Sequence, residues 1–569
     1  MNSTMKNIII IDVDALMPSR LGVFGNIGSV SPTLDNLAKT SLNCTNAFSM
    51  GNPTEFALPG LFASAYLLDA NGYRYGISDN QSTFAEILKE NGYSTAAFMT
   101  AFRPKNDKYD RGFDDFYNLI DLQVTEKNLL NTAKWYREQY HNSKSLISQN
   151  ECIKDMVEYY SEYLDDMLLY CDNWETYISG LIVENSSIFD NVNYGTVRKM
   201  VLKDKIDFLE NETSYIISYF NGSDLGITEI ANEIKVNRDK KVRSTLMDLM
   251  IRITLILNIF VIFRKATSFR SSKNIIGHVF SMIKTGRKDI FNRYPTGQHI
   301  LSTFTNWLTY NRDEKKPFFA YMKLMDAHEM NIYSHDVQDK STNMKELSNA
   351  FKFFRSVGKN KKYTGNVLYD CGVRYSDEII KKTLEMLKEK SILDDTIVVI
   401  TADHGGLFPN IPVRDSGVHR VNSFVDELYR IPLIFCNIEI KAEEYKHLVS
   451  SVDINTTLLD MVGIDSPSSF RGGSILNEGF KRDHVLFEDQ GRGPCHLKYK
   501  PIKVCVRTES KKIVYESQPN IGNKGVVTEA FDLSLDPEEF RNIANNKDFI
   551  LTCTRLIKIA ELRVIEILK

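Results

Sequence analysis

The sequence TIVVITADHGG at residues 396–406 decides the fold. Its apolar and β-branched beginning is typical of a strand that is buried on both faces of a parallel sheet. Asp403 and His404 follow directly, so a carboxylate and an imidazole leave the carboxyl end of that strand together. Ligands of open α/β sheets bind at such strand ends, and this pair of side chains suits a divalent metal ion. A polar strand end with an Asp-started turn explains the pattern equally well.

A second strand with a similar ending lies near the start of the chain. Residues 7–14 read NIIIIDVD, an apolar run that ends in Asp14. If both strands are central and parallel, Asp14 meets Asp403 and His404 at one edge of the sheet. Two carboxylates and one imidazole could then hold one divalent ion and leave one position open. Taken alone, Asp14 is more often a turn or helix-capping residue.

Helical and strand patterns alternate along most of the chain, which indicates a doubly wound α/β sheet. We expect further strands at residues 43–48, 93–99, 318–325, 428–435, 504–507 and 512–515, and helices at 32–38, 55–64, 82–91 and 375–390. A chain of 569 residues with 43% hydrophobic residues can bury a large core. Its eight cysteines have scattered spacings without a CxxC pair, which favours reduced thiols and a cytoplasmic protein.

Residues 118–295 interrupt this alternation and have a helical period. The basic stretch 238–294 contains 13 Lys or Arg and 3 Asp, although the whole chain has a net charge of −3. It could bind an anionic lipid or glycan, which would place the protein peripherally at a membrane, or it could be a solvated helical cap. Its apolar part, 246–263, contains Asp248 and Arg252 and is therefore a poor membrane-spanning helix. We expect four parts: 1–117 and 296–470 as the two halves of the α/β domain, 118–295 as a helical insertion, and 471–569 as a C-terminal subdomain.

Thr54 precedes the helix predicted at residues 55–64 and has two possible roles. As an N-cap, its hydroxyl would accept a hydrogen bond from a backbone N–H of the first helical turn. As a nucleophile, it would stand at the positive end of the helix dipole, where free N–H groups can hold an oxyanion. A metal ion at that place would lower the pKa of the hydroxyl. The sequence leaves both roles open.

Several motifs together resemble the sulfatase branch of the alkaline-phosphatase superfamily. They lie at residues 7–25, 32–38, 112–114, 316–328, 375–404, 430–434 and 531–542, the last of which reads FDLSLDPEEFRN. The resemblance implies a doubly wound, mostly parallel sheet with a helical insertion and a small C-terminal α+β subdomain. It also implies an enzyme that acts on sulfate or phosphate esters, with Asp14, Asp403 and His404 holding one divalent ion. Ca²⁺, Mn²⁺ and Zn²⁺ are all open, as is a second ion.

The chain departs from this family at the nucleophile. Sulfatases carry Cys or Ser in a Cys-x-Pro-Ser-Arg motif, and that residue is oxidised to formylglycine. Here Thr54 stands at the corresponding position and cannot become formylglycine, and Leu58 replaces the Arg. Ala15 stands where many sulfatases have a second Asp. The remaining set resembles the metal-plus-threonine site of the phosphoethanolamine transferases, which implies a phospho-threonine intermediate.

The same resemblance implies four further site residues. His328 and His419 stand where the family places catalytic or substrate-contacting groups, and Asp326 and Lys512 where it holds the substrate. With Asp326, the two histidines could form a second metal site or protonate the leaving oxygen. Asp326, His328 and His419 could equally be polar loop residues, and Lys511 could take the place of Lys512.

We therefore expect an anionic ester substrate, which could be carried on a saccharide or a polysaccharide precursor, and no nucleic-acid partner. Two alternatives stay open. One is a true sulfuric ester hydrolase that uses Thr54 directly. The other is a non-catalytic relative that binds an anionic glycan or a membrane surface, but a binding module has no need of Asp14, Asp403 and His404 together.

Overall fold

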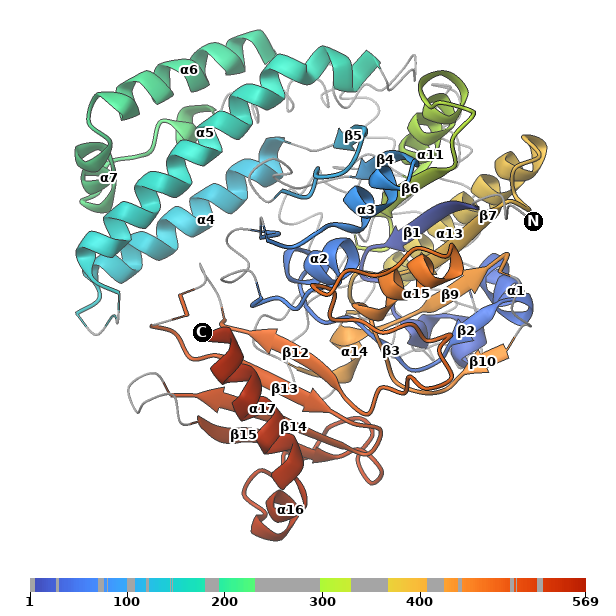
Figure 1. Ribbon diagram of the computed structural model, residues 1–569. Coiled ribbons are helices and arrows are strands. Elements are labelled where there is room, and N and C mark those ends of the chain that lie inside the picture. Colours follow the sequence, from blue (N-terminus) through green and yellow to red (C-terminus); the bar gives the residue numbers. More distant parts are fainter. Residues whose placement is uncertain are drawn as a thin grey trace, which may run out of the picture. The chain divides into compact units, whose positions relative to one another are not determined.

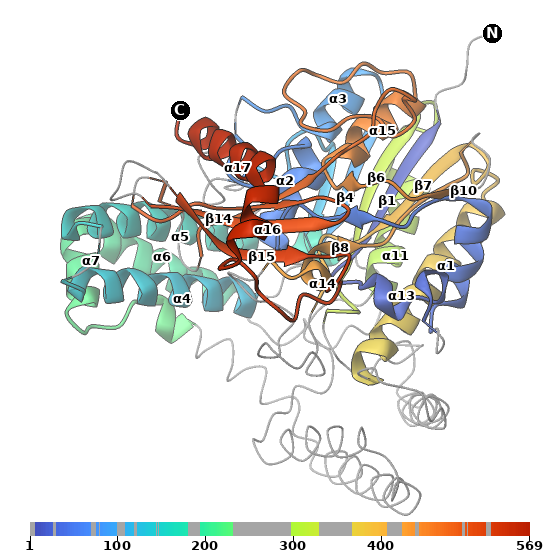
Figure 2. The same cartoon turned by 90° about the horizontal axis from the view of Figure 1, so that it is seen from below.

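The structure is a computed structural model, shown as a ribbon in two orientations (Figures 1 and 2). It describes residues 6–26, 30–69, 76–78, 80–99, 108–118, 122–143, 145, 147–179, 194–230, 297–328, 367–406, 424–438, 443–491, 496–497, 499–518 and 525–569. The chain divides into two compact units. Unit 1 comprises Met1–Asn118, Phe304–His328 and Ser376–Lys569, and unit 2 comprises Leu119–Thr303 and Glu329–Tyr375. The four-part division stays a prediction.

An eight-stranded sheet forms the centre of unit 1, with strand order β10-β2-β9-β7-β1-β6-β4-β5 (Figure 1). Its strands are β1 Asn7–Val13, β2 Leu42–Cys44, β4 Ser94–Met99, β5 Asp115–Asn118, β6 Phe318–Leu324, β7 Thr396–Thr401, β9 Leu433–Cys436 and β10 Glu443–Tyr445. Neighbouring strands pair in parallel except for β9, which is antiparallel to β2 and β7. The predicted α/β class with a mostly parallel sheet is confirmed.

Strand β1 lies between β6 and β7 and pairs in parallel with both. The Cα partners of Asp12 are Lys323 in β6 and Thr401 in β7. Because the three strands run in the same direction in this register, their carboxyl ends meet at one edge of the sheet. Asp14 and Asp403 follow β1 and β7 at that edge, as the two apolar runs predicted.

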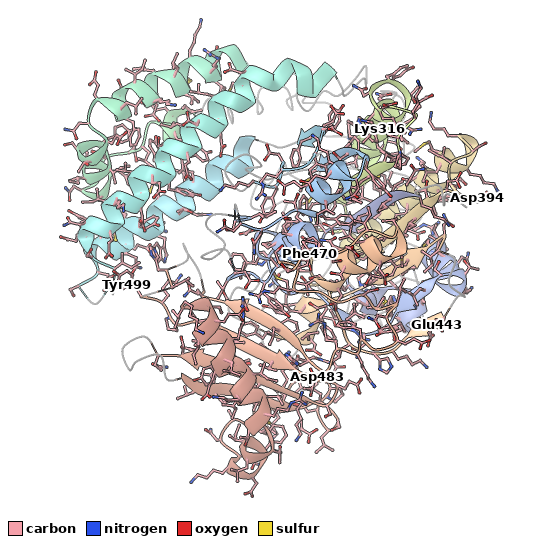
Figure 3. The ribbon with its side chains drawn as sticks, in the orientation of Figure 1. Lys316, Asp394, Glu443, Phe470, Asp483 and Tyr499 are labelled. Carbon is pink, nitrogen blue, oxygen red and sulfur yellow. The ribbon has the colours of Figure 1, made fainter. Side chains whose placement is uncertain are left out.

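The amino edge of the same strands is marked by two exposed charged residues. Lys316 and Asp394, which are labelled in Figure 3, precede β6 and β7 by two residues each. Between the two edges, β1, β6 and β7 are buried almost throughout, which explains their long apolar runs.

Helices lie on both faces of this sheet. The helices that belong wholly to unit 1 around this sheet are α1 Pro32–Leu37, α2 Thr54–Ala63, α3 Phe84–Glu90, α14 Asp426–Tyr429 and α15 Asp453–Met461. Two more, α11 Gly297–Asn306 and α13 Val367–Glu389, belong to unit 1 from residues 304 and 376 onward. Figure 2 shows α2, α3 and α15 on one face, with α1 and the 376–389 part of α13 on the other. The carboxylate of Asp377 caps α1 from α13 by accepting hydrogen bonds from the N–H groups of Thr33 and Leu34. Ser31, which occupies the N-cap position of α1, makes no side-chain cap bond.

Two smaller sheets complete unit 1. One has the order β11-β3-β8, with β3 Ala47–Phe48, β8 Arg430–Ile431 and β11 Val449–Ser450. The other is antiparallel and consists of β12 Val485–Asp489, β13 Lys503–Arg507, β14 Lys511–Ser517 and β15 Gly525–Asp532. Two helices follow, α16 Lys547–Thr552 and α17 Thr554–Ile567. Leu556, Ala560 and Val564 of α17 belong to the same apolar cluster as Val504 and Ile513 of the antiparallel sheet.

Unit 2 is helical in its described part. Its helices are α4 Leu122–His141, α5 Gln149–Ser179, α6 Tyr194–Glu210 and α7 Glu212–Phe220. Buried Asp204 of α6 accepts hydrogen bonds from Tyr160 of α5 and Tyr215 of α7, so one carboxylate joins three helices. The basic stretch 238–294 lies outside the described residues. Within the described part of the chain, no helix combines the length and the apolar character needed to cross a membrane.

Two predicted strands were wrong in detail. Residues 428–435 include the end of α14, then β8 and β9, because Pro432 has no N–H to donate to a continuous ladder. Residues 43–48 form β2 and β3, which belong to different sheets. Strands β5, β10, β11, β12 and β15 were not predicted, and α13 begins eight residues before its predicted start.

Candidate metal and catalytic site

Backbone hydrogen bonds fix Asp403 just beyond β7. Its Oδ1 atom accepts hydrogen bonds from the N–H groups of His404 at 2.8 Å and Ala15 at 3.2 Å. Ala15 has a φ of 57°, which costs roughly 1–2 kcal/mol for a residue with a Cβ atom. The strained turn after β1 therefore joins the loop after β7 through one carboxylate.

The backbone of Gly405 fixes the orientation of the His404 imidazole. Nδ1 of His404 lies 2.6 Å from the carbonyl oxygen of Gly405. A carbonyl can only accept, so Nδ1 carries the hydrogen and Nε2 offers a lone pair to the site. The N–H of Gly405 donates to the carbonyl of Leu428 at 2.8 Å. A Cβ atom on Gly405 would lie 2.0 Å from the carbonyl oxygen of Glu427, so this position requires glycine.

Thr54 brings its hydroxyl to the same place from the first position of α2. Its Oγ1 lies 3.1 Å from Asp14 Oδ2 and 3.3 Å from His404 Nε2. Of the two roles left open for Thr54, the capping role is not observed, because Pro53 occupies the N-cap position and no described side chain makes a cap bond. The Thr54 hydroxyl instead donates to the carboxylate of Asp14.

Asp14, Asp403 and His404 form a group that fits a divalent ion. One ligand atom from each lies within 4.8 Å of the others, and all three side chains are buried. Asp14 Oδ1 is buried, and no described residue makes a hydrogen bond to it. An unpaired buried carboxylate oxygen is costly unless a cation or another donor satisfies it. Two carboxylates and an imidazole are also a common ligand set for divalent metals.

Lys323 is the residue that sequence reasoning missed. It is completely buried in β6, and its Nζ lies 2.9 Å from Asp12, 3.0 Å from Asp14 and 2.9 Å from Asp403. A signal for it exists in the sequence. Lys323 and Asp12 each interrupt an apolar run shortly before the end of a buried strand, where an unpaired charge is expensive.

The charges of this cluster shift the pKa values of its members. Burial alone would lower the pKa of Lys323, but Asp12, Asp14 and Asp403 raise it well above its ordinary value, so the ammonium stays charged. Burial alone would raise the pKa of Asp403, but His404, when protonated, and Lys323 bring it below the ordinary value. Burial raises the pKa of Asp12 to about 6 against the opposing charge of Lys323.

The structure places the other predicted site residues as follows. Asp326 is buried and His328 half-buried, and both follow β6 at the edge of the sheet that carries Asp14. His419 lies outside the described residues. The roles assigned to these three residues stay predictions.

Lys512 belongs to a different cluster. Its Nζ donates to Asp426 at 2.7 Å and also to Glu539, and both carboxylates are largely buried. Glu539 in turn accepts a hydrogen bond from the N–H of Asp426 at 2.7 Å. The FDLSLDPEEFRN motif, which contains Glu539, therefore joins the antiparallel sheet to α14. Lys512 serves this junction, and its assigned contact with substrate stays a prediction.

Comparison with known proteins identifies a family. A family model described as Sulfatase matches residues 6–172 and 264–464. Arylsulfatase K of Bos taurus is 29% identical over 182 residues, which cover 30% of this chain and 31% of that protein. The match thus spans less than a third of this curated relative.

Two solved structures share the fold over nearly the whole chain. The phosphonate monoester hydrolase of Agrobacterium radiobacter has a TM-score of 0.54 at 15% identity, covering 99% of this chain and 96% of that one. A protein solved in complex with its substrate D-glucosamine-2-N,6-O-disulfate has a TM-score of 0.53 at 13% identity, covering 99% and 98%. At such identities the likeness shows the fold alone, and that fold is of the alkaline-phosphatase and sulfatase type.

Proposed function

The chain belongs to the sulfatase family, and we propose that it cleaves or transfers phosphate or sulfate esters with Thr54 as the nucleophile. One observation carries the proposal. The Thr54 hydroxyl lies within hydrogen-bond distance of Asp14 and His404, two members of the group that fits a divalent ion. A threonine that served only as a helix cap would bond to the backbone of α2, which Thr54 does not.

The neighbours of Thr54 can activate its hydroxyl. Asp14 Oδ2, which already accepts the hydroxyl hydrogen at 3.1 Å, can take the proton as the oxygen attacks. A divalent ion held by Asp14, Asp403 and His404 would supply Lewis-acid chemistry and stabilise negative charge. The start of α2 presents N–H groups and the positive end of the helix dipole to an anionic ester.

The reaction then takes two balanced steps. The Thr54 oxygen forms a bond to the ester phosphorus, the bond from phosphorus to the leaving oxygen breaks, and the leaving alcohol takes up a proton. Water or an acceptor alcohol next attacks the same phosphorus, which frees Thr54 and returns a proton to its oxygen. Half-buried His328 is our candidate for the proton donor to the leaving alcohol.

Phosphate is our first choice over sulfate. Sulfatases use a formylglycine made from Cys or Ser, and Thr54 cannot be converted to it. The fold shared with a phosphonate monoester hydrolase is consistent with phosphorus chemistry. The sequence similarity to an arylsulfatase supports sulfate as the second candidate.

We further propose that the ester is carried on a saccharide. The sulfated glucosamine in the related structure supports this class of substrate. A cytoplasmic location is also a proposal, in keeping with the free, buried cysteines of the described residues, namely Cys44, Cys152, Cys171, Cys436, Cys505 and Cys553. Peripheral contact with a membrane through residues 238–294 is a separate proposal.

Turnover of model substrates by matched variants tests the proposed function. Aryl phosphate monoesters and diesters and aryl sulfates are offered to the metal-stripped protein after Mn²⁺, Zn²⁺ or Ca²⁺ is added back. Thr54→Ser keeps a hydroxyl and should keep measurable turnover, whereas Thr54→Val keeps the branched shape and should lower kcat by roughly 1,000-fold or more. Near-native turnover by Thr54→Val would exclude the nucleophile, and faster turnover of aryl sulfates would reverse our choice of ester.

A further inference from the structure

A buried ion pair between Asp12 and Lys323 lies next to the proposed metal site. Asp12 and Lys323 are Cα partners on β1 and β6, and both side chains have no exposed surface. Asp12 Oδ2 accepts hydrogen bonds from Lys323 Nζ at 2.9 Å and from the hydroxyl of Tyr321 at 2.6 Å. A charged pair at this depth gains little net stability over apolar side chains of similar size. Because Lys323 also contacts the carboxylates of Asp14 and Asp403, the pair has a role in the site.

The ammonium of Lys323 forms an ion pair with one oxygen of each proposed ligand carboxylate. It lies 3.0 Å from Asp14 Oδ2 and 2.9 Å from Asp403 Oδ2. The other oxygen of Asp403 accepts the two backbone hydrogen bonds from Ala15 and His404. Asp14 Oδ1 is the oxygen of these two carboxylates that has no hydrogen-bond partner among the described residues. Bidentate binding by either carboxylate would have to compete with the ammonium.

We propose that Lys323 is a positioning residue that makes the centre prefer Mn²⁺ or Zn²⁺ over Ca²⁺. Calcium takes six to eight oxygen ligands and often binds carboxylates in bidentate fashion. Lys323 engages Oδ2 of Asp14 and Oδ2 of Asp403, while backbone N–H groups engage Oδ1 of Asp403, so bidentate binding by either carboxylate is disfavoured. The third ligand is a nitrogen of His404, which suits transition metals. This inference rests on the metal centre of the proposed function and adds its selectivity.

The same ammonium also sets the charge of the centre. Asp12, Asp14 and Asp403 contribute three negative charges and Lys323 one positive charge, so with neutral His404 the cluster has a formal charge of −2. One divalent ion would neutralise it. Removal of Lys323 alone would leave an uncompensated buried carboxylate and could unfold the protein.

A double variant removes the ion pair and keeps this charge. In Asp12→Asn/Lys323→Met both members lose their charges, and the Asn oxygen can still accept the hydrogen bond from the Tyr321 hydroxyl. Asp453→Asn/Arg482→Met is the matched control, because it removes another buried ion pair of unit 1, one that involves none of the proposed metal ligands. Circular dichroism and thermal unfolding of each variant establish that it is folded.

Calorimetric titration of the metal-stripped proteins with Mn²⁺, Zn²⁺ and Ca²⁺ measures the selectivity. We expect the native protein to bind Mn²⁺ and Zn²⁺ more tightly than Ca²⁺, and the double variant to lose roughly 10-fold or more of that preference. The control variant should keep the native preference. An unchanged preference in Asp12→Asn/Lys323→Met would overturn the role of Lys323 and leave the proposed function intact.

Titration of the native protein alone also decides the proposal. Tighter binding of Ca²⁺ than of Mn²⁺ and Zn²⁺ would overturn it even if the double variant failed to fold. If none of the three ions bound the native protein, the metal centre of the proposed function would fail, and the role of Lys323 with it.

Discussion

The hydroxyl oxygen of Thr54 lies 3.1 Å from Oδ2 of Asp14, although one residue begins helix α2 and the other follows strand β1. This contact joins the candidate nucleophile directly to a candidate metal ligand. It also places the hydroxyl beside a carboxylate that can take its proton. The metal ligand predicted at the end of a strand and the nucleophile predicted at the start of a helix thus meet in one buried contact.

Asp403→Asn should abolish metal binding and turnover together. The substitution removes the negative charge of a ligand while keeping its size and one oxygen for the backbone N–H groups of Ala15 and His404. Calorimetric titration and turnover of an aryl phosphate measure the two effects. Asp394→Asn, at the exposed amino end of the same strand, is the control and should change neither. Native-like metal affinity in Asp403→Asn would show that the ligand assignment is wrong.

Gly405→Ala should impair the site without unfolding the sheet. Its Cβ atom would meet the carbonyl oxygen of Glu427 at 2.0 Å, so the Asp403–His404 loop must shift. A displacement of about 1 Å can cost roughly 100-fold in rate. Gly406→Ala is the matched control, since its nearest contact would be an ordinary 3.5 Å to Met17 Sδ. Equal turnover by the two variants would show that glycine at position 405 is not needed to place the Asp403–His404 loop.

Acid should destabilise the protein partly through His299. Burial lowers the pKa of this α11 residue to about 4, against about 6.5 in an unfolded chain. The unfolded state therefore binds the proton more readily between pH 6.5 and pH 4. Stability is full above pH 6.5 and falls as the pH decreases through this window, by about 3 kcal/mol at most.

Urea unfolding at pH 7 and pH 4.5 measures this effect. His299→Leu should show a smaller loss of unfolding free energy between the two pH values than the native protein. His447→Gln, which changes a more exposed histidine, should behave like the native protein. The assignment fails if His299→Leu loses as much stability in acid as the native chain.

The basic stretch 238–294 should bind anionic vesicles at low salt. Its 13 Lys or Arg against 3 Asp favour negatively charged lipid headgroups, and salt should weaken the attachment by screening. Co-sedimentation with phosphatidylserine vesicles over a salt series measures it, with phosphatidylcholine vesicles as the control. If the protein did not bind these vesicles at low salt, the alternative role of this stretch, a solvated helical cap, would be favoured.

The sequence predicts the candidate metal ligands because they follow two long apolar runs. The runs that end at Asp14 and before Asp403 are typical of central strands, and parallel pairing brings their carboxyl ends together. Thr54 was found through its place before a helix and through the family resemblance. Its contact with Asp14 was not predicted, because a hydroxyl before a helix is explained locally by capping.

Lys323 shows the limit of reading one strand at a time. Within β6 it looks like a polar interruption, and only its register with Asp12 on β1 reveals a buried ion pair. The register depends on long-range pairing that neither segment encodes alone. Lys323 was not predicted and lies at the site, whereas Lys512 was predicted to contact substrate and lies in another cluster. There it forms ion pairs with Asp426 and Glu539.

Mass spectrometry of enzyme trapped with substrate tests the role of Thr54 most directly. The protein is mixed with an aryl phosphate and its preferred metal ion, quenched at low pH during turnover and digested. We predict an adduct with the mass of a phosphoryl group on the peptide that contains Thr54, and none on that peptide from Thr54→Val. An unmodified Thr54 peptide throughout turnover, together with a near-native rate for Thr54→Val, would contradict the mechanism.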